Sequence, residues 1–574
     1  MAKLAGKIMG ARRWMLCAAA AACLALPASA QQRNSDPAPV AVPAASVERA
    51  AAPKLLIVIS VDQFSADLFA QYRTQFRGGL DRLARGVVFP SAYQAHGATE
   101  TCPGHSVILT GNYPAHTGIV ANNWYDLSLT RDDRRVYCSE DPTIAGTSSR
   151  SGQYQTTTAN LMVPTLGDYM KDANGAARVI SIAGKDRAAI MMGGHHADEM
   201  WWLAPTGLAS LPGRTPSEFV ARLSSAVAAN INTARPDLDV PAQCAALNHP
   251  VDIGGGKSVG TGHLGRDAGN FRGFMASPEA DASVLAVGAA MQAQYHLGQG
   301  TGTDLLILGL SATDYVGHGY GPGGVEMCLQ MAALDRELGD FFARMDATGV
   351  DYAVALTADH GGHDLPERNR ENAIGDAARV AAGLSADDLS DRLKAELGMQ
   401  GFSGPLLYSD GPFGDYYYAR GLSAGDRARV ETAVMRILRA NPQVETVMTA
   451  AEIAAVPIST RSPELWTIAE RLRASYYPGR SGDFLVVLKP RVTPITNPSN
   501  GYVATHGSVW DYDRRVPLLF WRRDMAGFEQ PNPVRVADLA PTLAGLIGLS
   551  IDPARFDGHC LDLLSGPASS CPTR

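Results

Sequence analysis

Six short apolar runs recur along the chain and alternate with segments of helical pattern. They cover residues 55–60, 179–183, 305–310, 352–357, 484–488 and 516–521. Continuous apolar runs of this length are typical of strands that helices bury on both faces. Between the third and fourth runs, apolar residues recur at three- and four-residue spacing over residues 325–345, which predicts a crossover helix. The pattern therefore predicts a three-layer α/β/α sandwich with a mainly parallel central sheet.

Three stretches interrupt this alternation and are rich in Gly, Pro, Ser and Tyr. They lie at about residues 126–163, 204–299 and 365–480. The length of 574 residues and the hydrophobic content of 46% allow one large domain with insertions, or two or more domains. We interpret the three stretches as insertions that cap the functional site, so that residues 53–574 form a single domain.

Residues 1–30 have the pattern of a secretory signal peptide. Basic residues precede an Ala/Leu-rich stretch at residues 14–26, and Ala28-Ser29-Ala30 fits a small-residue cleavage site. The apolar stretch is shorter than the roughly 20 residues of a membrane span, and no later uncharged segment reaches that length. Residues 31–52 are rich in Pro, Ala and Ser, which indicates a flexible leader. The sequence thus predicts a secreted, periplasmic protein without a membrane span; a lipoprotein anchored at Cys23 is the alternative, which the small residues before Cys23 disfavour.

The charge and the cysteines limit the partners and the compartment. A net charge of −7 gives no sign of a surface for a nucleic-acid polymer, and no obligate protein partner is evident. Six cysteines lie beyond the predicted signal peptide, an even number in an oxidising compartment, so disulfides are expected. Cys560 and Cys571 are the expected local pair, and a disulfide at Cys102 would lock the loop around it. The alternative for each cysteine is a buried free thiol.

A scattered set of carboxylates and imidazoles has the chemistry of metal ligands. The set consists of Asp62, Asp314, His318, Asp359, His360 and His506. Its three acidic members follow predicted strands closely, and the carboxyl ends of strands are where open α/β sheets place their sites. The four-residue spacing of Asp314 and His318, and the adjacency of Asp359 and His360, allow each pair to face one metal ion. Mixed Asp and His ligands without Cys favour two Zn²⁺ ions, with Mn²⁺ or Fe as lesser options.

Thr101 is the candidate nucleophile. It precedes Cys102-Pro103-Gly104-His105, in which a proline at the first helical position predicts the start of a helix. A threonine there is expected to face free backbone N–H groups, which favour an oxyanion such as phosphate. Metal ligands, hydroxyl and anion site together indicate phosphoryl transfer.

Two cations and an amide are candidates for substrate contacts. Lys185 and Arg187 follow the predicted strand at residues 179–183, where they would clamp phosphoryl oxygens, the lysine as a point charge and the arginine as a fork. Asn122 would add a neutral donor. The alternative is a solvated basic turn.

The other histidines near these motifs are not assigned as ligands. His105 is expected to be a buried hydrogen-bonding residue in the first turn after Thr101. His363 is expected to lie behind the metal ligands. The pair His195-His196, which precedes Trp201-Trp202, is expected to pack within a strand-like segment.

The order and spacing of these motifs resemble a known enzyme family. Thr101 to His105, Leu-Thr-Gly111 and Asn122 resemble the nucleophile region of the type I phosphodiesterase/nucleotide pyrophosphatase branch of the alkaline phosphatase superfamily. Lys185 and Arg187 make the chain similar to the PafA-type alkaline phosphatases of that branch. The resemblance extends to the end of the chain, through Thr-His506-Gly-Ser and the segment at residues 538–542. The related sulfatases are disfavoured, because Cys102-Pro103 lacks their Cys-x-Pro-x-Arg signature.

The resemblance implies a role for each motif residue. It places Asp62, Thr101, Asp359 and His360 on one Zn²⁺ ion and Asp314, His318 and His506 on the other. It also implies that Asn122, Lys185 and Arg187 bind the non-bridging phosphoryl oxygens. The expected function is an exported zinc alkaline phosphatase that hydrolyses small-molecule phosphate monoesters through a phosphothreonine. The alternatives are a phosphodiesterase/nucleotide pyrophosphatase on the same scaffold and, more remotely, a non-catalytic exported protein that binds metal or phosphate.

Overall fold

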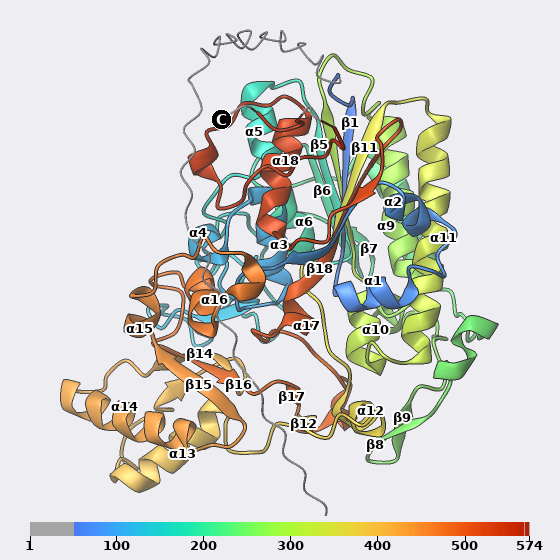
Figure 1. The fold of residues 1–574 in the computed structure, drawn as a ribbon. Helices are drawn as coiled ribbons and strands as arrows, with labels where there is room; N and C mark the ends of the chain where they lie inside the picture. Colours follow the sequence, from blue (N-terminus) through green and yellow to red (C-terminus); the bar gives the residue numbers. More distant parts are fainter. Residues whose placement is uncertain (1–50, 567–568, 573–574) are drawn as a thin grey trace, which may run out of the picture. The chain divides into compact units, whose positions relative to one another are not determined.

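The computed structural model describes residues 51–566 and 569–572. The predicted signal peptide at residues 1–30 and the predicted leader up to residue 50 lie outside the described residues. Within the described part, the main sheet has ten strands in the order β19-β2-β18-β11-β1-β10-β5-β6-β7, with β20 paired to β2. Helices lie on both sides of this sheet (Figure 1). The predicted three-layer α/β/α architecture is therefore confirmed.

Four of the predicted runs form the parallel centre of the main sheet. β1 (Leu55–Val61) pairs in parallel with β10 (Asp304–Leu310) and with β11 (Tyr352–Thr357). β10 pairs in parallel with β5 (Val179–Ala183), and β5 pairs in parallel with β6 (Glu199–Ala204). Every residue of β1, β5, β10 and β11 is buried, which is why these runs show no alternation of apolar and polar residues.

The sheet becomes antiparallel toward one edge. β18 (Arg515–Arg522) runs antiparallel to β11 and to β2 (Val87–Tyr93). The edge strands are β7 (Gly207–Ala209), β19 (Phe528–Glu529) and β20 (Val534–Arg535). The predicted run at residues 516–521 thus forms a strand of this sheet, in the antiparallel direction.

The two helical layers come from different parts of the chain (Figure 1). One layer contains α1 (Ala66–Tyr72), α2 (Gly79–Ala84), α9 (Pro278–Gln294) and α11 (Val325–Ala347); the other contains α3 (Thr101–Thr110), α5 (Leu166–Ala173), α6 (Asp186–Gly193) and α18 (Leu539–Leu546). The predicted crossover helix is present as α11. α9 packs against β10 and β5, although it lies inside the stretch at 204–299 that the sequence predicts as an insertion. That part of the stretch belongs to a main layer of the fold.

One predicted strand belongs to a separate sheet. β16 (Phe484–Leu488) lies in a four-stranded antiparallel sheet of order β13-β14-β16-β15, with β13 (Leu407–Tyr408), β14 (Gly414–Tyr418) and β15 (Val444–Thr449). α13 (Ala386–Leu397) and α14 (Ala424–Arg439) share a buried apolar cluster with this sheet. The assignment of the 484–488 run to the rhythm of the main sheet was therefore wrong, because a short buried run has the same pattern in either sheet.

Shorter elements complete the described part. The helices are α4 (Pro114–Thr117), α7 (Glu218–Ile231), α8 (Phe271–Met275), α10 (Ala312–Tyr320), α12 (Pro366–Glu371), α15 (Ala450–Ala454), α16 (Ile468–Ser475) and α17 (Asp511–Arg514). The two-stranded sheets pair β3 (Asn123–Tyr125) with β4 (Arg135–Tyr137), β8 (Val251–Gly254) with β9 (Lys257–Val259), and β12 (Ala378–Arg379) with β17 (Val492–Thr493).

Three disulfides connect the six cysteines beyond the predicted signal peptide. They are Cys102–Cys138, Cys244–Cys328 and Cys560–Cys571. The predicted local pair is confirmed, and the first disulfide joins α3 to the residue after β4. Within residues 51–566 and 569–572, no helix combines the length and the apolar character that crossing a bilayer requires.

Candidate metal centre

The scattered acidic and histidine residues converge at the carboxyl ends of the central strands. Asp62 follows β1 directly, Asp314 lies in the first turn of α10 after β10, and Asp359 lies two residues beyond β11. They form two buried groups, and the candidate ligand atoms of each group lie within 4.8 Å of one another. The groups are Asp62, Asp359 and His360, and Asp314, His318 and His506. The structure thus brings together all six residues, in the division that the resemblance implies.

The first group has the unsatisfied atoms expected of a cation site. His360 Nε2 lies 3.4 Å from Asp62 Oδ1 and 3.3 Å from Asp359 Oδ2. Neither His360 Nε2 nor Asp62 Oδ1 has a hydrogen-bond partner among the described residues. Burial and the neighbouring Asp359 carboxylate raise the pKa of Asp62 well above its usual range, and burial lowers the pKa of His360 to about 3. A bound cation would oppose the raised pKa of Asp62, because it favours the carboxylate, and burial already keeps His360 in the neutral form that a metal ion binds.

The second group is centred on one carboxylate oxygen. Asp314 Oδ1 lies 3.2 Å from His318 Nε2 and 3.3 Å from His506 Nε2. The two imidazole rings come from segments far apart in the sequence, and their centroids are 5.0 Å apart. One carboxylate and two imidazoles are a donor set that suits a borderline metal ion.

The three imidazoles share one hydrogen-bond arrangement. His360 donates from Nδ1 to the carbonyl of Gly361 at 2.9 Å, His318 donates to that of Ala504 at 2.9 Å, and His506 donates to that of Thr99 at 2.8 Å. Because a carbonyl oxygen can only accept, each Nδ1 must carry the proton, which leaves the lone pair of each neutral ring on Nε2. Each Nε2 faces a buried carboxylate, which is the orientation of metal-bound histidine. The residues present therefore fit a pair of metal ions.

Lys185 lies between the two groups. Its Nζ atom is 2.5 Å from Asp62 Oδ2 and 2.6 Å from Asp314 Oδ2. Burial disfavours the ammonium group, but these two carboxylates outweigh that effect and raise the pKa of Lys185. Lys185 Nζ is also 3.5 Å from Thr101 Oγ1, so that a fixed positive charge adjoins the candidate nucleophile.

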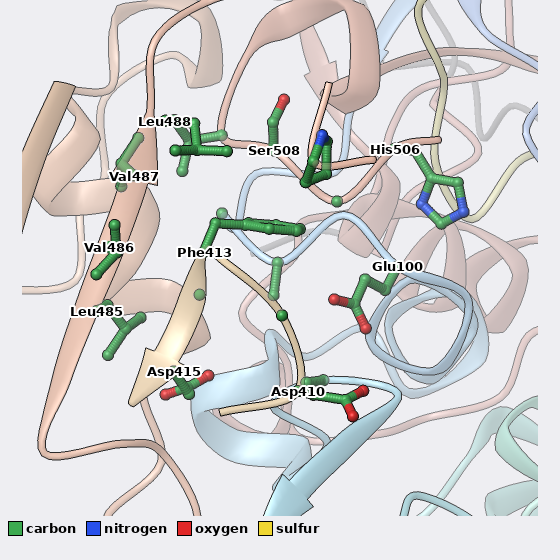
Figure 2. A pocket seen from close by; sticks show the side chains of 18 of the residues that line it. Glu100, Asp410, Phe413, Asp415, Leu485, Val486, Val487, Leu488, His506 and Ser508 are labelled. Atoms are coloured by element: carbon green, nitrogen blue, oxygen red, sulfur yellow. The ribbon is translucent and has the colours of Figure 1, made fainter. Parts of the chain in front are cut away.

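A cavity of about 260 Å³ gives access to this centre (Figure 2). Asn122, His318 and His506 line it at the end nearest the two groups. Its other wall comes from the four-stranded sheet and the loop before β14. The segment that the sequence predicts as a cap therefore contributes to the approach to the centre.

Thr101 is the first residue of α3, so the helix begins two residues before the proline that was expected to start it. The expected set of free N–H groups is also smaller, because the Cys102 N–H donates to Asn122 Oδ1 at 2.8 Å and Pro103 has no N–H. This bond occupies the oxygen of Asn122 and leaves its amide nitrogen as the group that can donate to a ligand. The Thr99 hydroxyl donates to the Ser508 carbonyl at 2.7 Å, whereas the Thr101 hydroxyl lies near Lys185.

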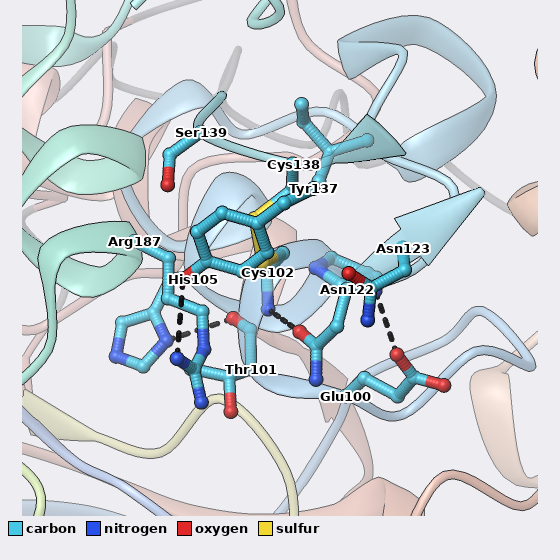
Figure 3. Close-up of a disulfide and its surroundings, with 12 residues drawn as sticks. Glu100, Thr101, Cys102, His105, Asn122, Asn123, Tyr137, Cys138, Ser139 and Arg187 are labelled. Carbon is cyan, nitrogen blue, oxygen red and sulfur yellow. Dashed lines mark hydrogen bonds between the residues drawn. A yellow bond between two sulfur atoms is a disulfide. The ribbon is translucent and has the colours of Figure 1, made fainter. Parts of the chain in front are cut away.

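The Cys102–Cys138 disulfide lies near Thr101 and Arg187, and the Arg187 side chain extends toward Thr101 (Figure 3). Arg187 is half-buried in the first turn of α6, and its Nη1 donates to the Tyr137 hydroxyl at 3.2 Å. The Tyr137 hydroxyl in turn donates to Asp186 Oδ1 at 2.7 Å. Tyr137, which accepts the bond from Arg187, directly precedes Cys138. The disulfide therefore connects the residue that holds Arg187 to the helix that carries Thr101.

Gln63 is a site residue that sequence reasoning missed. Its backbone N–H donates to Asp359 Oδ1 at 3.1 Å, and its Nε2 donates to Asp314 Oδ1 at 3.2 Å, so it spans both groups. The backbone of Gln63 has a φ of 63°, which is uncommon for a residue with a side chain. Gly317 makes room for it, since a Cβ atom there would lie 1.6 Å from Gln63 Oε1. The only sequence signal is its position next to Asp62.

The remaining histidines behave differently from one another. His105 is buried as expected, with Nδ1 2.8 Å from the Thr101 carbonyl and 3.0 Å from Asp359 Oδ2. His363 bonds through Nε2 to Thr493 Oγ1 at 3.0 Å rather than to the carboxylates of either group. The expectation that His195 and His196 pack was wrong: both are exposed at the turn after α6, because the strand begins only at Glu199.

The chain is similar in sequence and in fold to known proteins. Residues 56–509 match the type I phosphodiesterase / nucleotide pyrophosphatase family. The chain is 52% identical over 522 residues to alkaline phosphatase PhoK of Sphingomonas sp., covering 90% of this chain and 92% of that protein. It is 46% identical over 530 residues to alkaline phosphatase PhoD of Zymomonas mobilis, covering 91% and 90%. The crystal structure of wild type alkaline phosphatase PafA is similar at a TM-score of 0.77 and 25% identity, covering 90% of this chain and 100% of that one.

Proposed function

The chain belongs to the type I phosphodiesterase / nucleotide pyrophosphatase family, and we propose that it is an exported zinc-dependent alkaline phosphatase that hydrolyses phosphate monoesters through a phosphothreonine on Thr101. Its relatives over nine-tenths of the chain are named alkaline phosphatases, and the chain is accordingly a hydrolase of phosphate esters. Three buried imidazoles, whose Nε2 atoms face buried carboxylates beside a buried threonine, support the proposal most strongly.

Zinc is the proposed metal because the donor set combines Asp and His without Cys. Asp62, Asp359 and His360, together with Thr101, would hold one ion, and Asp314, His318 and His506 would hold the other. When bound, the two ions supply Lewis acidity at the attacking and leaving oxygens of the phosphoryl group.

The residues of the chain then account for the two halves of the reaction. The Thr101 Oγ attacks phosphorus, and an Oγ–P bond forms as the bond from phosphorus to the alcohol oxygen breaks. The alcohol leaves with a proton, and water cleaves the phosphothreonine to release inorganic phosphate and restore the hydroxyl. Lys185, Arg187 and the amide nitrogen of Asn122 bind the non-bridging oxygens, where they stabilise the charge of the transition state.

The cations favour a monoester over a diester as the main substrate. A monoester dianion places more negative charge on its non-bridging oxygens than a diester does, and the buried Lys185 and the half-buried Arg187 both lie near the nucleophile. Phosphodiesterase or nucleotide pyrophosphatase activity is the second candidate, because the family is named for it. A non-catalytic binding protein is disfavoured, since an intact hydroxyl lies next to the complete donor set.

Export is proposed from two features. Residues 1–30 have the signal-peptide pattern, and three disulfides are typical of proteins that fold in an oxidising compartment.

The purified protein tests the proposal with a matched pair of aryl phosphate esters, one a monoester and one a diester. We expect faster release from the monoester, loss of activity after removal of metal with a chelator, and recovery on addition of zinc. Faster hydrolysis of the diester would favour the second candidate. Activity that survives complete removal of metal would contradict the two-metal assignment.

A further inference from the structure

The cavity lined by Glu100, the residue before Thr101, has a wall that the reaction at phosphorus does not use. It is formed by Asp410, Phe413 and Asp415, from β14 and the loop that precedes it, opposite Glu100. In Figure 2, the Phe413 ring extends toward Glu100 and His506 in the same space. The volume of about 260 Å³ is suited to a group of the size of one substituted ring.

Gly507 shows how closely the two sides approach. Its φ is 108°, and a Cβ atom there would lie 3.2 Å from Phe413 Cζ and 3.5 Å from Glu100 Cγ. A side chain at this position would therefore fill the space between the ring edge and the carboxylate. The glycine keeps that space open next to His506, one of the proposed metal ligands.

Carboxylates line both sides of the cavity, with Glu100 on one side and Asp410 and Asp415 on the other. Glu100 is the residue before Thr101, and its Oε2 accepts the Asn122 N–H at 2.7 Å. Among the described residues, no basic side chain forms an ion pair with Glu100. Asp410 pairs with Arg135 and accepts a bond from Asn123 Nδ2, and Asp415 accepts the Gly482 N–H. Lys489 and His363 are basic residues of the same lining. Glu100 and Asp415 thus lack an ion-pair partner among the described residues, and of the two Glu100 is the one that adjoins Thr101 in the chain.

We propose that this cavity receives the leaving group of the substrate and selects monoesters of ring-bearing alcohols that carry no negative charge. This inference rests on the proposed phosphatase function. An alcohol oxygen that departs from phosphorus on the side opposite Thr101 emerges toward His506, so its substituent enters the space between Glu100 and Phe413. The Phe413 ring offers an apolar face to an aromatic substituent. Glu100 repels an anionic substituent, such as a carboxylate or a further phosphate. Water in the cleft screens this repulsion between negative charges only weakly.

The test compares phenyl phosphate with 3-carboxyphenyl phosphate, in the wild type and in Glu100→Gln. Glutamine keeps an oxygen for the Asn122 N–H, so the variant removes the charge with little change of shape. We expect the wild type to prefer the neutral ester, and Glu100→Gln to raise the relative kcat/KM of the carboxylated ester by about tenfold, a change equivalent to roughly 1.4 kcal/mol. Glu445→Gln, an exposed residue of β15, is the matched control and should leave the ratio unchanged.

A second variant tests the apolar face. Phe413→Leu should lower the kcat/KM of phenyl phosphate relative to ethyl phosphate by about 3- to 10-fold compared with the same ratio in the wild type. The comparison of ratios cancels the difference in intrinsic reactivity of the two esters. Unchanged ratios in both variants, with phosphate still released, would overturn the leaving-group assignment and leave the phosphatase function intact. Failure of the wild type to release phosphate from any of these esters would overturn the proposed function, and the cavity assignment with it.

Discussion

The imidazole of His506 donates from Nδ1 to the backbone carbonyl of Thr99 at 2.8 Å. This bond joins a histidine from the C-terminal part of the chain to the loop that leads into the nucleophile helix. The carbonyl orients His506 Nε2 toward Asp314, and the same loop places Thr101 two residues later. The proposed nucleophile and a proposed ligand of the second metal are therefore positioned by one stretch of backbone.

Thr101→Ala is expected to fold and to bind metal but to lose most of its turnover, because the variant lacks the oxygen that attacks phosphorus. Thr99→Ala is the matched control. It keeps the carbonyl that supports His506 and removes only a hydroxyl bonded to the Ser508 carbonyl. Steady-state assays of both variants, with metal content measured on the same samples, distinguish the two positions. Turnover near that of the wild type in Thr101→Ala would rule out the nucleophile assignment.

Chelation is expected to abolish activity, and zinc is expected to restore it better than magnesium. Three of the six proposed side-chain ligands from the two groups are imidazoles, which suit a borderline ion, whereas magnesium prefers oxygen ligands. Activity and bound metal should be measured during titration of the metal-free protein with each ion. Full restoration by magnesium alone would contradict the choice of zinc.

The Cys102–Cys138 disulfide is expected to matter for catalysis as well as for stability. A double variant with alanine at both positions should lower kcat/KM for a monoester by roughly 10- to 100-fold, because Thr101 and the support of Arg187 lose their connection. The control is the corresponding double variant at Cys560 and Cys571, a disulfide of the C-terminal segment. Equal activities of the two double variants, each assayed well below its Tm, would show that the first disulfide has no positioning role.

Glu337 on α11 is expected to make stability depend on pH. Burial and the nearby Asp281 raise the pKa of Glu337 to about 9, and Glu337 Oε2 has no hydrogen-bond partner among the described residues. The unfolded carboxyl has a pKa of about 4.3, so the folded state holds an extra proton between these values and loses stability as pH rises through them. We expect the wild type to lose about 1 kcal/mol or more of unfolding free energy between pH 6 and pH 9 relative to Glu337→Gln.

Urea unfolding of both proteins at the two pH values measures this effect. Glu445→Gln, which removes an exposed carboxyl, should follow the wild type. Parallel pH dependence in the wild type and in Glu337→Gln would show that the Glu337 carboxyl is already ionised at pH 6 in the folded protein, so that its pKa is not raised.

The parts of the fold that follow from periodicity were predictable, and those that depend on tertiary contacts were not. The runs at 179–183 and 352–357 coincide with β5 and β11, because strands buried on both faces leave an unbroken apolar pattern. The run at 484–488 has the same pattern but lies in the smaller sheet, since pattern alone does not specify the partner strand. α3 begins at Thr101 rather than at the proline, because Asn122 caps the Cys102 N–H from a distant position in the sequence.

The candidate site, too, could be predicted from the sequence only in part. The six candidate ligands could be identified from the sequence because Asp and His residues near the ends of strands carry recognisable chemistry. Gln63 could not, because its role depends on a positive φ and on contacts with carboxylates about 250 and 300 residues away. The backbone carbonyls that orient the three imidazoles left no signal either, since any residue can supply a carbonyl.

Variants of Lys185 and Arg187 test most directly the central claim that the protein is a phosphomonoesterase. The measurement is kcat/KM for matched aryl mono- and diesters in the wild type, in Lys185→Ala and in Arg187→Ala. Removal of one preorganised hydrogen-bond donor that stabilises the charge of the transition state typically lowers the rate by about 100- to 1,000-fold. We expect a loss of that size on the monoester. The diester should lose clearly less, since a substituent replaces one of its charged oxygens. Equal losses on both esters would contradict the account, because the two cations would then support the site generally rather than recognise a monoester.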